Sequence, residues 1–567
     1  MKNLIFFLII VFSSVLQSQT FTNQLEIPPT LSGPEFTLTI KQSQKEFIAG
    51  KTSNTFSYND MNYLGPTLIF QSGETVSFNI TNSTNEDATV HWHGFHIPAK
   101  WDGGPQELIT PGSTWSPEFE VMEQASTMWY HSHVHGNTEA QVSKGMAGLI
   151  IIKDDEEAAL NLPRDYGVDD FPLIIQDREF DNSRQIQPAH LGSVMMVNGT
   201  VSPYLETPAQ VVRFRMLNAS NERTYNIGFD DNRSYYQIGT DGGLLQAPVN
   251  LNRLVIAPGE RAEILVDLTN ETSGNSLNLM SYGTELGQGI AGAFHTGPGG
   301  GDGPLDSTDF NIMQLRIVDP TVNAVTSIPS SLVNIDFINT SLIDRIRTKT
   351  LLNPANPGDP FSIDGELFDM NIINDTVMLG ATEIWKFVNT SSLAHPMHIH
   401  DVQFNIISRN GNPPPVNETG WKDVAFVHPD ETVEVVAKFD DFADSVYAYM
   451  YHCHLLGHED NGMMHRFIVV DPAWYETTSV EHSSSAESKS VVNFYPNPAG
   501  SFVNFNLNRV SNKTVIKIYN VLGELVENKT FYNRQIPRMN LSNVARGLYI
   551  VSLNMDGKRQ VMKLIKK

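Results

Sequence analysis

Cysteine is nearly absent from this sequence: Cys453 is the only one among 567 residues. A single cysteine cannot form an internal disulfide, so a fold held together by disulfides is excluded. Positive charge is also scarce, with 38 Lys and Arg against 63 Asp and Glu and a net charge of −25. Nucleic acids and anionic membranes both attract basic surfaces, so we expect neither of them as a partner.

Long apolar runs are missing except at the N-terminus. Lys2 precedes an apolar stretch at residues 4–15, and the polar residues Ser18, Gln19 and Thr20 follow at once. The stretch is too short for a transmembrane anchor, and it is typical of a secretory signal, which we assign to residues 1–19. No twin arginine precedes it, so we expect export through the periplasm in an unfolded state, and a secreted or cell-surface location.

One sequence pattern occurs three times. Each copy has an aromatic residue four positions before an asparagine: Phe78 with Asn82, Phe214 with Asn218, and Trp385 with Asn389. Each copy continues with an apolar run, a Pro-Gly or Pro-Asp turn and alternating apolar residues, as in LITPGSTWSPEFEV, LVIAPGERAEILVD and VAFVHPDETVEVVAKF. Alternation with period two predicts antiparallel strands, and regular short strands build sandwiches or barrels. We therefore expect three copies of one β-sandwich, with chance similarity as the weaker alternative.

The domain limits follow from these copies and from composition. We expect sandwich domains at residues 20–158, 159–322 and 323–475, a linker rich in Ser and Glu at residues 476–490, and a separate β-rich domain at residues 491–567. A Gly-rich loop between Gly283 and Pro304 interrupts the second domain and is expected to be mobile. The last segment carries NFYPNPAG, IKIYNVLGE, ARGLYIVSL and a Lys-rich end in this order. It resembles the C-terminal sorting domain of type IX secretion cargo, which implies the secretion machinery as a partner; an ordinary accessory domain is the alternative.

Histidines gather in four clusters, which hold ten of the 17 in the chain: HWH at His91, HSH at His131, HPMHIH at His395, and HCHLLGH at His452. Residues i and i+2 of a strand point to the same face. Four pairs therefore each present two imidazoles together: His91 with His93, His131 with His133, His398 with His400, and His452 with His454. Eight imidazoles suit a cluster of several metal ions, whereas a structural zinc site needs only four ligands.

Cys453 lies between two of these histidines and points to the opposite face of the same strand. A thiolate from Cys453, imidazoles from His458 and His395, and a thioether from Met463 would make a blue-copper electron-transfer site. The peptide bonds on either side of Cys453 lead to His452 and His454, so the two predicted sites have a short covalent connection. A buried and inert cysteine is the alternative, and these neighbours disfavour it.

The motifs HWHG, HSHVHG, HPMHIH and HCHLLGHEDNGMM resemble the copper motifs of three-domain multicopper oxidases over about residues 30–472. WDGGPQ and GWKD make the copper-efflux branch the most similar. The resemblance implies an all-β fold of three cupredoxin-like Greek-key β-sandwiches followed by a small C-terminal β-sandwich. It also implies an enzyme, a monomer, that oxidises a reducing substrate one electron at a time and reduces O2 to water with four electrons.

The resemblance also implies four copper ions per chain and a ligand for each. The type 1 copper would be bound by His395, Cys453 and His458 with Met463 as axial ligand, and the type 2 copper by His91 and His398. The two type 3 coppers would be bound by His93, His131 and His454, and by His133, His400 and His452. The trinuclear cluster would lie between the first and third sandwiches, and the middle one would supply no ligand.

Reduction of O2 also consumes protons, so acids are expected near the cluster. The resemblance assigns proton relay to Asp102, eleven residues after His91, and to Glu459, which follows His458. A solvated surface acid is the alternative for each of them.

The substrate is less certain than the chemistry. Oxidases of cuprous ion usually carry a Met-rich insertion, and this chain has no dense Met cluster and has Ser391, Ser392, Leu393 and Ala394 before His395. A phenol or aromatic amine is therefore the first expectation, and a cuprous or ferrous ion the second. A non-catalytic scaffold is weaker, because all the ligands are present, and a copper nitrite reductase would not need the additional histidine pairs.

Overall fold

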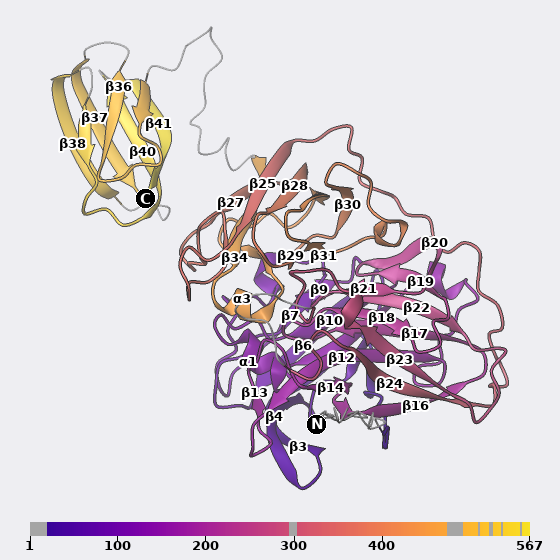
Figure 1. Ribbon diagram of the computed structural model, residues 1–567. Helices are drawn as coiled ribbons and strands as arrows, with labels where there is room; N and C mark the ends of the chain where they lie inside the picture. The colour runs from indigo at the N-terminus through magenta and orange to yellow at the C-terminus, as the bar shows by residue number, and fades with distance from the viewer. Residues whose placement is uncertain are drawn as a thin grey trace, which may run out of the picture. The chain divides into compact units, whose positions relative to one another are not determined.

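The computed structural model describes residues 20–293, 303–472, 492–507, 511–520, 525–534, 537–555 and 558–567. The predicted signal at residues 1–19, the predicted linker at residues 476–490 and residues 294–302 of the Gly-rich loop lie outside the described residues. The chain forms two compact units: the first comprises Met1–Leu367, Ala381–Lys438 and Tyr449–His465, and the second Phe368–Gly380, Phe439–Ala448 and Arg466–Lys567. β-Strands dominate both units (Figure 1). Among the described residues, no helix has the length and apolar character needed to cross a membrane.

The first sandwich consists of two sheets. One sheet has the order β4 (Lys51–Tyr58), β3 (Glu35–Ile48), β6 (Thr75–Asn82) and β8 (Thr114–Trp115), with β9 (Glu118–Glu120) also paired to β6. The other has the order β2 (Thr30–Ser32), β5 (Thr67–Gln71), β11 (Ala147–Lys153), β10 (Ser126–His131) and β7 (His91–His93). Aromatic rings including Phe36, Phe78 and Trp92 fill the space between them. Its short helices are η1 (Ala99–Trp101) between β7 and β8, α1 (Thr138–Ser143) between β10 and β11, and α2 (Asp155–Ala158) after β11.

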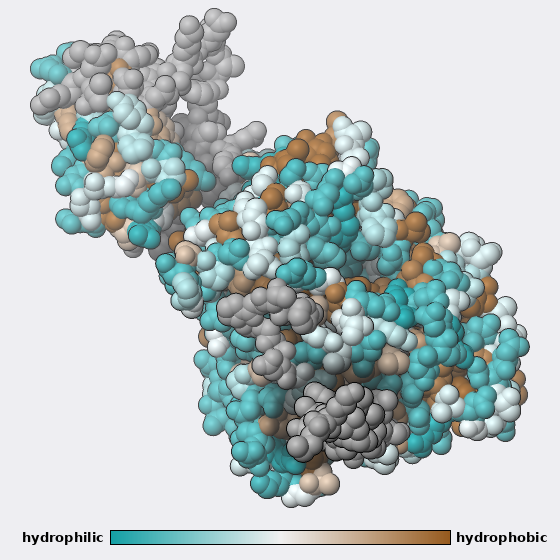
Figure 2. Space-filling view, viewed as in Figure 1, coloured by the Kyte–Doolittle hydropathy of each residue, from teal (hydrophilic) through white to brown (hydrophobic). Residues whose placement is uncertain are grey.

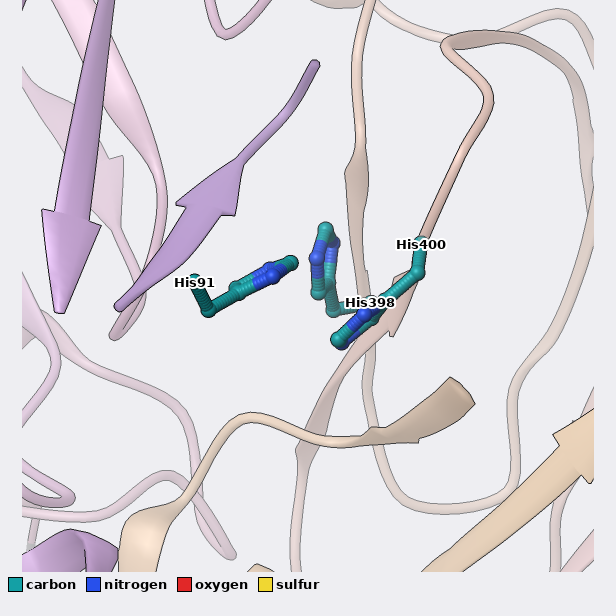
Figure 3. A group of neighbouring side chains, drawn as sticks. All are labelled: His91, His398 and His400. Atoms are coloured by element: carbon teal, nitrogen blue, oxygen red, sulfur yellow. The ribbon is translucent and has the colours of Figure 1, made fainter. Parts of the chain in front are cut away.

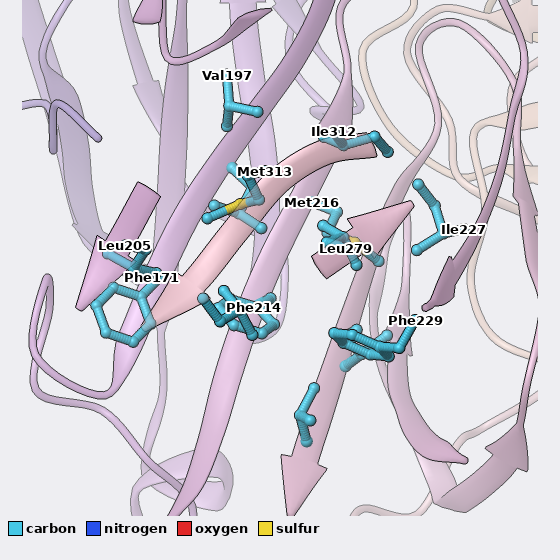
Figure 4. Packing of buried hydrophobic residues seen from close by; sticks show 14 of the residues in the cluster. Phe171, Val197, Leu205, Phe214, Met216, Ile227, Phe229, Leu279, Ile312 and Met313 are labelled. Atoms are coloured by element: carbon cyan, nitrogen blue, oxygen red, sulfur yellow. The ribbon is translucent and has the colours of Figure 1, made fainter. Parts of the chain in front are cut away.

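The second sandwich is larger. Its eight-stranded sheet contains β15 (Thr200–Val201), β14 (Val194–Val197), β12 (Asp170–Phe180), β17 (Val211–Asn218), β22 (Arg261–Asp267), β19 (Tyr235–Thr240) and β20 (Gly243–Leu251), with β13 (Ile186–Gln187) beside β12. Its six-stranded sheet contains β1 (Asn23–Gln24), β16 (Pro203–Pro208), β24 (Asp309–Val318), β23 (Ser276–Tyr282), β18 (Tyr225–Phe229) and β21 (Leu254–Ile256); η2 (Gly283–Glu285) follows β23. Phe214, Phe229 and Met313 pack in the core between the sheets (Figure 4).

The third copy has one sheet with the order β26 (Ser362–Ile363), β25 (Arg345–Leu352), β28 (Ala381–Asn389), β32 (Thr432–Phe439) and β30 (Phe404–Arg409). In its other sheet, β29 (His395–Ile399) lies between β33 (Tyr449–Cys453) and β31 (Val424–Val427). Two short helices, η3 (Val416–Glu418) and α3 (Leu456–Asp460), complete this part of the first unit.

The second unit contains the C-terminal β-sandwich. Its sheets are β35 (Val492–Tyr495), β36 (Phe502–Leu507) and β39 (Arg538–Asn540), and β38 (Leu525–Arg534), β37 (Ser511–Tyr519), β40 (Gly547–Met555) and β41 (Lys558–Lys566). Val503, Ile516 and Val551 are buried in its own core. In the same unit, β27 (Asp375–Met378) pairs in parallel with β34 (Met464–Val470). The separate small β-sandwich expected from the sequence is therefore confirmed.

The repeated asparagine has the same role in each copy. Asn82, Asn218 and Asn389 end the strands β6, β17 and β28, and each of these strands pairs in parallel with an earlier strand of its copy, namely β3, β12 and β25. The side-chain amide of each asparagine donates to the backbone carbonyls of two separate stretches of chain, for example to Glu86 and Ile109 in the first copy at 2.8 and 2.6 Å. Its oxygen accepts from the backbone N–H two residues later. The sequence pattern therefore marks a turn that is held in the same way three times.

The surface in view is mostly hydrophilic, with hydrophobic residues scattered singly or in small groups (Figure 2). Such scattered apolar residues are normal for folded proteins. The acidic composition thus resides largely on the outside, whereas the histidine clusters lie inside the first unit.

Candidate metal centre

Strand pairing brings the histidine motifs together two at a time. In the first copy, β7 pairs antiparallel with β10, and His91 lies opposite His131. In the third copy, β29 pairs antiparallel with β33, and His398 lies opposite His452. Residues opposite each other in neighbouring strands have adjacent side chains. Each pair of strands therefore presents a patch of imidazoles on one face, as the period-two spacing predicts.

The two patches face each other and interleave. The His91 and His400 rings stack with centroids 4.0 Å apart, and the His93 and His398 rings stack at 3.7 Å. His91 reaches from β7 toward His398 and His400, whose rings turn toward it (Figure 3). The cluster is therefore built from elements about 300 residues apart in sequence, and it lies wholly within the first unit.

The ligating atoms form three groups of histidines, each with its atoms within 4.8 Å of one another: His91, His398 and His400; His93, His131 and His454; and His133, His400 and His452. All of these side chains are buried. The structure thus brings together the eight histidines expected for the trinuclear cluster. His400, assigned to one type 3 copper, also lies beside the two histidines assigned to type 2.

Hydrogen bonds orient these rings. The Nδ1 atoms of His91, His131 and His398 lie 2.8–2.9 Å from the backbone carbonyl oxygens of Asp102, Ser132 and Asp423. Donation from Nδ1 leaves the lone pair on Nε2, which is the tautomer that binds metal through Nε2. The Nε2 atoms of these three residues have no hydrogen-bond partner although they are buried.

Buried polar atoms without a partner are uncommon in folded proteins and need an explanation. Here the unpaired nitrogens converge. Burial lowers the pKa of six of the rings well below the usual range, and neighbouring imidazoles lower it further; the six are His93, His131, His133, His398, His400 and His454. Burial lowers the pKa of His452 to about 3. Imidazole rings that are neutral and point into the same space can coordinate metal ions without first losing a proton. These histidines therefore fit a group of metal ions.

A second site lies on the other side of β33. The sulfur of Cys453 is 3.4 Å from Nδ1 of His395 and 3.7 Å from Nδ1 of His458. A turn after α3 returns the chain so that the Cys453 N–H donates to the Met463 carbonyl at 3.1 Å, and Met463 is buried. Burial raises the pKa of the Cys453 thiol well above its usual range, so a cation is needed to hold the thiolate.

Two acids contact the histidine cluster. Asp102 is buried, and its Oδ2 atom accepts from Nδ1 of His400 at 2.7 Å. Glu459 is buried on α3, and its two oxygens lie 3.3 Å from Nδ1 of His133 and of His452. Burial raises the pKa of Glu459 well above its usual range. Both acids named from the sequence therefore touch predicted ligands.

The middle sandwich also reaches the cluster, and one of its residues there was not singled out from the sequence. Arg261, at the start of β22, ion-pairs with Asp423, and its Nη1 lies 3.4 Å from Nδ1 of His93. Asp423 belongs to the GWKD motif, but neither the motif nor its spacing indicates a partner 162 residues away. The middle copy therefore supplies no histidine to the three groups, but it braces them.

Phe361 was also missed. Its ring stacks on His458 at 4.5 Å between centroids and meets His395 at 5.2 Å. A lone phenylalanine in a loop carries no sequence signal for such a place.

β-Sandwiches that bury a thiolate–imidazole site next to a histidine cluster are typical of cupredoxin-like metalloproteins that transfer electrons. Comparison with known proteins narrows this class. Two family models described as multicopper oxidase match residues 39–157 and 344–473, and a model for the secretion system C-terminal sorting domain matches residues 493–567.

Among curated relatives, the multicopper oxidase mco of Staphylococcus haemolyticus is 33% identical over 439 residues, which cover 76% of this chain and 87% of the relative. The cell division protein FtsP of Xenorhabdus nematophila is 33% identical over 80% of this chain and 93% of its own length. The chain belongs to the multicopper oxidase family.

Solved structures of multicopper oxidases have the same fold as this chain. The McoA multicopper oxidase of Aquifex aeolicus has a TM-score of 0.71 and 33% identity, covering 80% of this chain and 100% of that one. A laccase-like multicopper oxidase, CueO from Ochrobactrum sp., has a TM-score of 0.70, 33% identity and coverage of 79% and 100%. The Campylobacter jejuni multicopper oxidase, described as a metallo-oxidase, has a TM-score of 0.67, 25% identity and coverage of 80% and 96%.

Membership makes copper the metal of this protein and makes the protein a copper-dependent oxidoreductase that uses O2 and a reducing substrate. The all-β, cupredoxin-like fold expected from the motifs is confirmed. The sorting domain indicates export to the cell surface or the medium.

Proposed function

We propose that this protein is a laccase-like oxidase, which removes single electrons from a phenol or an aromatic amine at a type 1 copper and reduces O2 to water at a trinuclear copper cluster. One observation carries the proposal. The Cys453 sulfur faces His395 and His458, while the adjacent residues His452 and His454 belong to two different histidine groups of the cluster. One strand thus connects the point where electrons arrive with the point where O2 is reduced.

The ligands are proposed as follows. His395, Cys453 and His458 bind the type 1 copper with Met463 as axial ligand; His91 and His398 bind type 2; His93, His131 and His454 bind one type 3 copper and His133, His400 and His452 the other. The three groups of buried nitrogens and the thiolate site support this assignment. All of these residues belong to one chain, which supports a monomer as the working unit.

The domain limits proposed are 20–158, 159–322, 323–475 and 491–567. They are supported by the three asparagine-held turns and by the two multicopper oxidase matches, which fall in the first and third ranges. Export through the periplasm, directed by a signal at residues 1–19, is also proposed, as is a linker at residues 476–490 before the sorting domain.

Bound copper supplies the one-electron chemistry; the chain supplies geometry and protons. Backbone carbonyls fix the imidazole rings through Nδ1, so the ligand set is oriented before the metal arrives. Asp102 contacts His400 directly, and Glu459 lies between His133 and His452. We propose that these two acids hold and pass the protons that O2 reduction consumes.

His458 is the proposed access point for the reductant, because it is only partly buried whereas His395 and Cys453 are fully buried. Phe361 stacks on its ring and offers an aromatic surface beside it. An aromatic reductant can therefore approach the imidazole edge and stack alongside, which favours a phenol or an aromatic amine.

A metal-ion oxidase is the second candidate, and one observation favours it. His190 and Glu222 pair at 2.7 Å over Gly457, the residue before His458, and Glu139 lies 3.6 Å from the same imidazole. Carboxylates near the access point could attract a cuprous or ferrous ion. The metallo-oxidase relative from Campylobacter jejuni is consistent with such a role.

Kinetics separate the two candidates. Copper-loaded protein is assayed with a methoxyphenol and with cuprous ion, and Glu222→Gln is compared with wild type. The proposal expects turnover of the phenol that Glu222→Gln leaves within about twofold, because a phenol is neutral and the loss of one carboxylate charge changes its association only modestly. Turnover of cuprous ion alone, with loss in Glu222→Gln, supports the second candidate instead.

The primary test is metal content with optical and EPR spectra of the purified protein. The proposal expects about four coppers per chain, intense blue absorption from a copper thiolate, and a near-ultraviolet shoulder from a coupled copper pair. Oxygen uptake without peroxide release then supports four-electron reduction. Protein that binds no copper would instead support a non-catalytic scaffold, a role to be weighed because the relatives include proteins named for cell division.

A further inference from the structure

The four His-X-His motifs differ in the residue between the histidines. In HSH and HIH it is Ser132 and Ile399, which cannot donate an electron, and in HCH it is Cys453. In HWH it is Trp92, whose indole can be oxidised by one electron. Trp92 therefore has the same covalent position relative to His91 and His93 as Cys453 has relative to His452 and His454.

Trp92 also lies on the opposite face of its strand from the two histidines. Its ring is fully buried in the core of the first sandwich, and it packs on Phe78 with centroids 4.4 Å apart. Trp115, on β8, stacks near it at 6.5 Å with the ring planes 21° apart. Trp115 is partly exposed. Two indoles therefore lie between β7, the strand that carries His91 and His93, and solvent.

We propose that Trp92 and Trp115 form a second electron supply to the copper cluster, separate from the Cys453 line. This pair of tryptophans, called the relay below, rests on the proposed function, because it works only if O2 is reduced at this cluster. Its role is to provide the missing electron when O2 is reduced before the substrate has delivered all four.

The electrons balance as follows. Reduction of O2 to two waters takes four electrons and four protons. If the coppers hold three electrons, the Trp92 indole gives the fourth and becomes a radical cation. Trp115 then gives one electron to Trp92, loses its N–H proton to solvent and becomes a neutral radical. A phenol in solution restores Trp115 by giving it one electron and one proton, and the phenol leaves as a phenoxyl radical.

The surroundings of Trp92 favour electron transfer from Trp115 to Trp92. Indole Nε1 can only donate a hydrogen bond, and that of Trp92 is buried without an acceptor. The Trp92 radical cation therefore has no base to take its proton, so it stays a strong oxidant and draws an electron from Trp115.

Two other aromatic residues near the relay are disfavoured as electron donors by the contacts that they make. Tyr130 lies 6.2 Å from Trp92, but oxidation of a phenol requires loss of its proton, and the Tyr130 hydroxyl donates to the Pro66 carbonyl, which is a very weak base. Trp101 lies 6.3 Å beyond Trp115, but the ammonium of Lys100 is 4.8 Å from its ring centroid and opposes positive charge there. Trp115 is therefore the terminus.

The test uses Cys453→Ser, which lacks the type 1 thiolate and can hold only three electrons at the cluster. The copper-loaded variant is fully reduced, freed of reductant and exposed to O2, and oxygenated tryptophans are mapped by peptide mass spectrometry. With no phenol present, the Trp115 radical combines with O2 and is recorded as an oxygenated product. Copper content and oxygen uptake are measured on the same samples, and reduced wild type, which has its fourth electron, is treated identically.

The relay predicts oxygenation of Trp115 in Cys453→Ser and little in wild type. Adding Trp115→Phe should abolish that product and move the damage to Trp92 or to the cluster histidines. Adding Trp421→Phe is the matched control, because Trp421 is also partly exposed but belongs to the third copy, and it should leave Trp115 oxidation unchanged.

If wild type consumes O2 and Trp115 of Cys453→Ser is no more oxidised than Trp421, the relay is wrong while the oxidase function stands. If copper-loaded, reduced wild type consumes no O2, the oxidase function and the relay both fail. Steady-state oxidation of a phenol by Trp115→Phe should equal that of wild type, because the normal supply runs through Cys453.

Discussion

Replacing Arg261 should strongly destabilise the junction beneath the histidine cluster. Its guanidinium is fully buried and donates to Asp423, to the Gly259 carbonyl at 2.9 Å and to the Thr127 carbonyl at 3.1 Å. Arg261→Met keeps most of the side-chain volume but leaves the Asp423 carboxylate buried without this cation. Removing one partner of a buried ion pair costs about 3–5 kcal/mol.

The matched control is Arg233→Met. Arg233 pairs with Asp231 at 2.7 Å and with Glu271 at 2.6 Å, but the arginine side chain is 20% exposed and Asp231 is 42% exposed. Ion pairs at the surface contribute about 0–1 kcal/mol, so this variant should unfold close to wild type. The two variants remove the same functional group and differ in burial.

Thermal unfolding of metal-free and copper-loaded protein provides the measurement. For a domain of this size, the expected loss corresponds to a midpoint lowered by about 10 °C in Arg261→Met and by at most a few degrees in Arg233→Met. Adding Asp423→Asn to Arg261→Met should recover part of the loss, because the unpaired charge is removed. Equal shifts for the two single variants, or no recovery in the double variant, would refute the reasoning.

Three further outcomes are expected. Cys453→Ser should abolish the blue absorption and steady-state oxygen uptake while copper remains at the cluster; unchanged colour and uptake would contradict the assignment. Burial alone would lower the pKa of His96, but the Asp401 carboxylate 3.0 Å away outweighs burial and raises the pKa to about 10. The ion pair should therefore stabilise the fold fully below pH ~6.5, and this stabilisation should be lost as the pH approaches ~10. The unfolding midpoint of wild type should fall over that window, and His96→Gln should flatten the fall; parallel pH curves would contradict this. Asn218→Ala should cost about 3 kcal/mol by leaving buried carbonyls unpaired, measured by denaturant unfolding beside the exposed control Asn79→Ala; equal costs would count against the asparagine-held turn.

Much of the site was predictable because strand geometry is regular. The side-chain alternation of a strand fixes which of His452, Cys453 and His454 share a face, and no tertiary information is needed for that. The repeated aromatic and asparagine pattern predicted three sandwiches, since the same turn recurs in each copy. Ligand types alone then indicated a thiolate site and a histidine cluster.

The remaining features depend on contacts between distant segments. Arg261 and Asp423 meet because the middle and third copies pack together, and an arginine in a PGER turn gives no sign of its partner. His190 had no role from the motifs, yet it pairs with Glu222 over Gly457. Phe361 stacks on His458 from a loop whose path the sequence does not determine. Each of these depends on how loops are positioned, which local periodicity does not encode.

The asparagine-held turn also shows which positions of the middle copy correspond to the histidines of the other two copies. Ala88, Tyr225 and His395 lie opposite Ile109, Ile256 and Val427, each two residues before the turn proline, so they are equivalent. Counting three and five residues onward gives His91 and His93 in the first copy, His398 and His400 in the third, but Gly228 and Asp230 in the middle. The scaffold is therefore indifferent to what these two positions hold. The same turn therefore accommodates histidines at these positions in the first and third copies and Gly228 with Asp230 in the middle copy, where Arg261 instead braces the cluster through Asp423.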